Sequence, residues 1–138
     1  MAFRRVSPGE AKELIEKEGY VYVDVRSVPE FEAGHPTGAY NAPIAHMGPA
    51  GMTPNPEFAA VMEARFPKDA RLVIGCKSGG RSMQAATVLD RLGFHNLVDQ
   101  RAGYDGSATE PGWRPAGLPT ATEAPAEQTW DGLKGSAR

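Results

Sequence analysis

The sequence predicts an α/β domain in three layers, with a parallel sheet between helices that cover both of its faces. Three short runs rich in apolar and β-branched residues, at 20–26, 71–75 and 96–99, alternate with segments of helical periodicity. Strands that alternate with helices are typical of parallel sheets buried on both faces. A chain of 138 residues fits one such domain, which buries roughly 70% of its unfolded surface without help from disulfides or metals.

The first helix carries the clearest local signals. Ser7 is a good N-cap, Pro8 suits the first helical position, and Glu10 completes a capping box. Gly19 is expected to end the helix, because glycine commonly follows a helix C-terminus. The strand predicted at 20–26 follows directly.

The rest of the chain continues the alternation. Further helices are predicted at 29–35, 56–66 and 81–94, and a further short strand at 38–44. Two stretches rich in Gly, at 46–56 and 102–112, predict loops, and the first of these is long and also rich in Pro.

The last stretch differs in composition. Residues 120–138 are rich in Pro, Ala and Glu, and they contain Trp130 and Leu133. We therefore divide the chain into a domain at 1–119 and a C-terminal tail at 120–138. The tail is either disordered or docked on the domain through those two apolar side chains.

Composition and charge exclude several functions. The net charge is −2, and no basic stripe or apolar run of ~20 residues indicates nucleic acid or a membrane. The chain begins without the apolar core of a signal peptide. His35, His46 and His95 lie in separate segments, so neither a metal nor another cofactor is expected. The single cysteine forms no internal disulfide, which favours the reducing cytoplasm.

That cysteine opens the segment CKSGGRS, between a predicted strand and a predicted helix. Such a loop can turn successive backbone N–H groups inward as an anion-binding nest, and the helix adds the positive end of its dipole. Gly79 and Gly80 permit positive φ angles and close backbone approach. Lys77 and Arg81 add positive charge. This field favours the nucleophilic thiolate of Cys76 and would hold an anion at its sulfur atom.

Two reaction classes fit a thiolate in such a cradle. One is phosphoryl transfer through a phosphocysteine, and the other is sulfur transfer through a cysteine persulfide. The loops of cysteine phosphatases hold one residue more than the four residues between Cys76 and Arg81. A shorter loop makes a smaller cavity, which favours a single sulfur atom, but both classes stay open on these residues alone.

Three segments together indicate one known family. CKSGGRS is preceded by VDVR (23–26) and EFEAGHPTGAYNAP (30–43), and it is followed by RAGYDG and the later GWRPAGLP. In this order they resemble the active-site loop, the first signature and the closing signature of the rhodanese-like sulfurtransferases. The resemblance covers about residues 7–119. It implies a rhodanese-like domain with a central parallel five-stranded sheet flanked by helices.

The resemblance also implies roles for the site residues. Cys76 would take sulfane sulfur from a donor such as thiosulfate and pass it to cyanide, a thiol or a sulfur-accepting protein. Asp24 and Arg26 would support the loop. The chain would act as a monomer or a homodimer, and its acceptor must come from outside because there is no second cysteine. The substrate would be bound by Lys77, Ser78, Gly79, Gly80, Arg81 and Ser82, mainly through backbone amides, with Arg81 ordering the loop.

The sequence departs from the family pattern in two places. Ala102-Gly103 replaces the usual Gly-Gly pair, and about six residues, SATEPG, are inserted before Trp113. Together with the loop at 46–56 they bear on donor and acceptor preference. Two alternative functions stay open: a small-anion cysteine phosphatase or arsenate reductase, and a non-catalytic binding module of the same fold.

Overall fold

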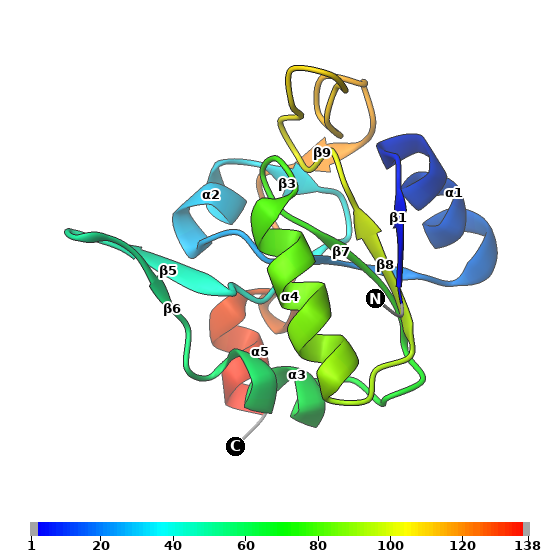
Figure 1. Cartoon of the computed structure of the whole chain (residues 1–138). Coiled ribbons are helices and arrows are strands. Elements are labelled where there is room, and N and C mark those ends of the chain that lie inside the picture. Colours follow the sequence, from blue (N-terminus) through cyan, green and yellow to red (C-terminus); the bar gives the residue numbers. More distant parts are fainter. Residues whose placement is uncertain (1–2, 137–138) are drawn as a thin grey trace.

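A five-stranded parallel sheet forms the middle layer of the protein, seen in a computed structural model that describes residues 3–136 (Figure 1). The strand order is β1-β8-β7-β2-β4, and every neighbouring pair is parallel. The fold class predicted from the sequence is therefore confirmed. The strands span Arg4–Val6 (β1), Val21–Asp24 (β2), Tyr40–Asn41 (β4), Arg71–Gly75 (β7) and Asn96–Gln100 (β8).

Helices cover both faces of this sheet. One hydrophobic cluster joins α3, α4 and α5 to one face, and a second cluster joins α1 and α2 to the other. Within residues 3–136, none of the helices is both long enough and apolar enough to cross a membrane. The helices span Pro8–Glu18 (α1), Val28–Ala33 (α2), Phe58–Arg65 (α3), Gly80–Arg91 (α4) and Trp130–Ser136 (α5), and a 3-10 turn spans Ala126–Gln128 (η1).

Successive residues of the central strands point to opposite faces. Leu72 and Ile74 of β7 belong to the cluster with α3, α4 and α5, whereas Val73 belongs to the cluster with α1 and α2. Strand β2 divides in the same way, with Val23 in the first cluster and Tyr22 in the second. Because both faces are buried, β7 is apolar almost throughout instead of alternating with polar residues.

The first helix begins as predicted. The Glu10 N–H donates to Ser7 Oγ at 3.1 Å, and the Ser7 N–H donates to the Glu10 carboxylate at 2.9 Å. Gly19 forms the C-cap. The other three predicted helices correspond to α2, α3 and α4, and their ends differ from the prediction by three residues at most.

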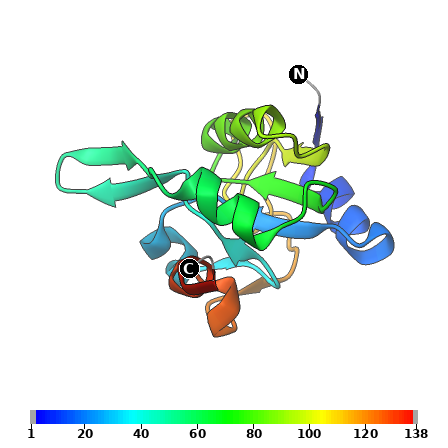
Figure 2. The same ribbon diagram turned by 90° about the horizontal axis from the view of Figure 1, so that it is seen from below.

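The prediction of a long loop at 46–56 is wrong. Strands β5 (Ala45–Gly48) and β6 (Gly51–Pro54) form an antiparallel hairpin there, with Met47 opposite Met52. The hairpin projects from the body of the domain (Figure 2). Its Gly and Pro residues lie at the turn and at the last strand position, where they do not interrupt pairing. Composition therefore indicates a loop although the two arms pair.

The C-terminal segment packs against the body of the domain. Trp130 and Leu133 are buried in the cluster with α3 and α4. A short antiparallel pairing of β3 (His35–Pro36) with β9 (Thr120–Ala121) ties the start of the segment down. Residues 120–136 are thus docked, and the last two residues of the predicted tail, 137 and 138, lie outside the described residues.

Candidate functional site

The candidate site lies where neighbouring parallel strands end at one edge of the sheet. Cys76 directly follows the central strand β7, Asp24 is the last residue of β2, and Asp99 is the last but one of β8. In open α/β folds, ligands bind beyond the carboxyl ends of the strands. The topology therefore brings the thiol and two buried carboxylates to the edge where chemistry is expected.

The Cys76 sulfur lies at the floor of the loop that joins β7 to α4. The residue is 2% exposed, and its Sγ accepts a hydrogen bond from the Gly79 N–H at 3.1 Å. The rest of the side chain packs in the cluster with α3, α4 and α5. A reactant therefore reaches the sulfur from the side of the loop amides.

The loop carbonyls are held outward. The carbonyls of Cys76 and Lys77 accept backbone N–H groups of residues 104–106, with shortest distances of 2.7 and 3.0 Å. The Gly79 carbonyl accepts the Met83 N–H of the first turn of α4 at 3.4 Å. The peptide bonds are trans, and in a trans peptide the N–H points away from the carbonyl. Each anchored carbonyl thus turns the next N–H toward the inside of the loop.

The loop presents a series of backbone N–H groups that have no carbonyl partner. Those of Lys77, Ser78 and Gly80 lie opposite the anchored carbonyls. Those of Arg81 and Ser82 belong to the open first turn of α4, where helix N–H groups have no intrahelical acceptor. Within the part of the chain that the structure describes, none of the five donates to a carbonyl. An anion near the sulfur would meet several donors at once.

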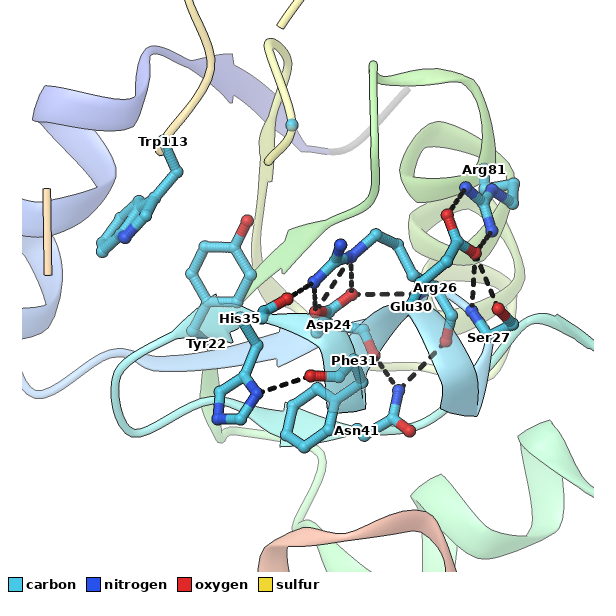
Figure 3. A network of polar contacts seen from close by, with 12 residues as sticks. Tyr22, Asp24, Arg26, Ser27, Glu30, Phe31, His35, Asn41, Arg81 and Trp113 are labelled. Atoms are coloured by element: carbon cyan, nitrogen blue, oxygen red, sulfur yellow. Dashed lines mark hydrogen bonds and ion pairs between the residues drawn. The ribbon is translucent and has the colours of Figure 1, made fainter. Parts of the chain in front are cut away.

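Arg81 pairs with α2, as Figure 3 shows. Its Nη1 and Nη2 donate to the two carboxylate oxygens of Glu30 at 2.7 and 2.9 Å. These hydrogen bonds raise the pKa of Arg81, against the opposing effect of burial. Burial opposes the ionisation of Glu30, but hydrogen bonds from Arg81 and Ser27 outweigh it and hold the pKa of Glu30 at about 2. The guanidinium therefore ties the start of α4 to α2.

Asp24 and Arg26 form a buried pair next to the residues that hold the loop. Arg26 Nη2 donates to Asp24 at 2.7 Å and to the Gly34 carbonyl at 2.6 Å. Burial lowers the pKa of Arg26, but the hydrogen bonds to Asp24 raise it more, so the net shift is upward. The guanidinium lies 4.3 Å from the centre of the Tyr104 ring. Since the Tyr104 N–H holds the Cys76 carbonyl, the pair supports the loop through Tyr104.

A further support has no motif in the sequence. Asp99 is fully buried, accepts the Ser82 hydroxyl at 2.5 Å and pairs with Arg5 Nε at 2.7 Å. Arg5 Nη2 also lies 3.5 Å from the Gly79 carbonyl. The Ser82 hydroxyl is therefore engaged by Asp99, which leaves its backbone N–H as the group that faces the loop. The sequence offers one indication of this support, which is the charged residue Asp99 at the end of an apolar strand.

A cavity of about 280 Å³ opens beside the loop. Its lining includes Lys77 of the loop together with Tyr104, Asp105 and Arg114. Lys77 and Ser78 are exposed. Arg114 forms an ion pair with Asp105 at 3.6 Å. Lys77 is thus an exposed cation of the loop that lines this cavity.

The histidines do not gather at the site. The two ring nitrogens of His35 contact the carbonyls of Phe31 and Glu123 at 2.8 and 3.0 Å. Within residues 3–136, no group of three His, Cys, Asp or Glu side chains is arranged to hold a metal ion.

Fold and site together define a class of protein, a parallel α/β domain with one thiol in an amide-lined loop after its central strand. The sequence matches the family model described as Rhodanese-like domain over residues 7–109. The chain belongs to the rhodanese-like domain family.

Relatives in sequence and structure agree with this assignment. Thiosulfate sulfurtransferase 16, chloroplastic, of Arabidopsis thaliana is 39% identical over 102 residues, which cover 74% of this chain and 80% of that protein. Rhodanese-like domain-containing protein 15, chloroplastic, of the same plant is 42% identical over 94 residues, which cover 68% of this chain and 51% of that protein. This chain thus spans about half of the second relative.

Among solved structures, Rv0390 from M. tuberculosis has a TM-score of 0.72 and 28% identity, covering 86% of this chain and 97% of that one. A polysulfide-sulfur transferase homodimer from Wolinella succinogenes shares the fold, with a TM-score of 0.64 and 20% identity over 87% of this chain and 79% of that one.

Proposed function

We propose that this protein is a sulfurtransferase that moves sulfane sulfur through a persulfide on Cys76. The donor is thiosulfate or a similar compound, and the acceptor is cyanide, a thiol or a protein. The observation that carries the proposal is the Cys76 sulfur at the floor of the loop, with the Gly79 N–H at 3.1 Å and five further loop amides that donate to no carbonyl within residues 3–136. Such donors stabilise negative charge on a bound anion or persulfide. Family members act on small sulfur donors and acceptors, and one relative is named a thiosulfate sulfurtransferase.

The reaction balances without a further oxidant or reductant. The Cys76 thiolate attacks the outer sulfur of thiosulfate and forms a new S–S bond. The original S–S bond breaks, and its electron pair leaves with sulfite. Cyanide then attacks the outer sulfur of the persulfide, which releases thiocyanate and restores the thiolate. Lys77, which is exposed on the loop, would attract the anionic donor.

The direct test is the intact mass of the protein after incubation with thiosulfate. We expect a gain of one sulfur atom, lost again on addition of cyanide as thiocyanate forms. Cys76→Ser, in which an oxygen replaces the one sulfur nucleophile, is the control and should show neither step. If thiosulfate, polysulfides and a protein persulfide all fail to load the wild-type protein, the proposal is refuted and the protein is a non-catalytic binding module.

Phosphatase or arsenate reductase activity is disfavoured by the position of Arg81. Both of its terminal nitrogens are engaged by Glu30, so the guanidinium is not free to bind a phosphate or arsenate at the sulfur. Turnover of an aryl phosphate or of arsenate that depends on Cys76 would contradict this reasoning. The cytoplasm remains our proposed compartment, because an unpaired reactive thiol persists under reducing conditions.

A further inference from the structure

A second cavity, of about 440 Å³, lies between α2 and the docked C-terminal segment. It shares no lining residue with the cavity beside the Cys76 loop. Pockets that hold small molecules have volumes of about 300–1,000 Å³, so this cavity can take a small ligand. The lining residues used below are Phe31, Glu32, Asn41, Glu123, Trp130 and Asp131.

Asn41 supplies a hydrogen-bond acceptor that no group within residues 3–136 satisfies. The residue is 1% exposed. Its Nδ2 donates to the Asp24 and Arg26 carbonyls, both at 3.0 Å, and its Oδ1 has no partner. Because the two carbonyls require the nitrogen, the amide cannot flip, and the oxygen lies on the side away from the Asp24 and Arg26 backbone (Figure 3). A buried acceptor without a donor is unfavourable, so this oxygen calls for an N–H or O–H from a ligand.

The walls and the rim narrow the chemistry of that ligand. Phe31 and Trp130 are buried aromatic residues at the cavity, and aromatic side chains offer a large apolar surface to a ligand. Glu32, Glu123 and Asp131 are exposed at its rim, and none of the described residues that line it is Lys, Arg or His.

Glu32 and Glu123 contribute most of the negative charge at the rim. Asp131 lies 3.7 Å from Lys134 and is therefore partly neutralised. Within residues 3–136, the carboxylates of Glu32 and Glu123 form no ion pair. The potential at the entrance is therefore negative, which repels anions such as the proposed sulfur donors and attracts cations.

We propose that this cavity binds a small organic ammonium ion. The ammonium N–H donates to Asn41 Oδ1, the apolar body of the ligand packs against Phe31 and Trp130, and the rim carboxylates draw the positive charge in. Its lining residues differ from those of the cavity beside the Cys76 loop, and ligand binding here does not require the sulfur chemistry.

The test titrates phenethylammonium chloride into the ¹⁵N-labelled full chain at low ionic strength, where exposed charges are least screened. We expect saturable shifts of the Trp130 indole N–H and the Asn41 side-chain NH₂ resonances. The neutral isostere 2-phenylethanol should bind at least roughly fivefold more weakly, because it lacks the charge. Phenylacetate should not bind. The cavity proposal fails if neither resonance moves at millimolar phenethylammonium, or if the neutral compound binds equally well.

A pair of charge variants separates the rim from a general effect of net charge. Glu32→Gln combined with Glu123→Gln should weaken phenethylammonium binding roughly four- to twenty-five-fold, since each exposed charge contributes about two- to fivefold. Glu18→Gln combined with Glu57→Gln makes the same change in net charge at exposed positions outside the cavity, and it should leave binding unchanged. Equal weakening in both double variants would overturn the proposed role of the rim. The free-state spectra show whether each variant remains folded.

Discussion

Two neighbouring glycines in the Cys76 loop should respond in opposite ways to the same substitution. Gly79 has a φ of +109°, and a Cβ at this position would overlap the carbonyl oxygen of Arg101. Gly80 is the first residue of α4, and a Cβ there would have nothing within 4 Å. Gly79→Ala therefore adds strain and a steric overlap, whereas Gly80→Ala adds neither.

The expected magnitudes follow from these two terms. An L-residue held at a strained positive φ costs about 1–3 kcal/mol, and an overpacked atom costs about 1–3 kcal/mol more. Gly79→Ala should thus lower the free energy of unfolding by roughly 2–6 kcal/mol, out of a total of about 5–15 kcal/mol for a typical domain. Gly80→Ala should leave it unchanged or raise it by up to about 1 kcal/mol, because alanine loses less backbone entropy in a helix.

Urea denaturation of the two variants and the wild type measures the difference. Sulfur loading from thiosulfate, assayed at a temperature where all three proteins are folded, provides a second measure. Gly79→Ala should load more slowly, because relief of the overlap displaces the N–H that contacts Sγ. If Gly79→Ala is as stable as Gly80→Ala, or loads sulfur at the wild-type rate, the described loop conformation is incorrect.

The remaining predictions concern the braces of the loop. Glu30 has a pKa of about 2, below its ordinary 4.5, so its contribution to stability is complete above pH 4.5 and is lost as pH falls toward 2. Glu30→Gln should cost about 1–3 kcal/mol at pH 7, and urea denaturation at a series of pH values should show this cost shrinking across that window. Arg5→Met leaves the buried Asp99 without its cation and should cost about 1–3 kcal/mol and slow sulfur loading, since it also releases the Gly79 carbonyl. Arg4→Met is the matched control on the same strand, and an equal effect there would refute the role of the pair.

Local chemistry accounts for the features that could be predicted from the sequence. The capping box of α1 involves residues three positions apart, and the loop after β7 has its thiol and glycines in one short segment. The Arg5–Asp99 pair, in contrast, joins residues 94 positions apart, and no periodicity reports such a contact. The direction of the loop amides also depends on residues 104–106, which hold its carbonyls. A motif can therefore indicate the loop without indicating what orients it.

Some residues that support the loop follow it in the chain, so they are synthesised after it. A nascent chain that ends with α4 already contains Cys76 and the complete loop. It still lacks β8, which carries Asp99 and forms the only bridge between β7 and β1 within the described sheet. The amides gain their fixed direction only after β8 has been inserted between those two strands. The thiol is thus synthesised before the residues that orient its loop, so we expect anion binding at the sulfur only after β8 and residues 104–106 are in place.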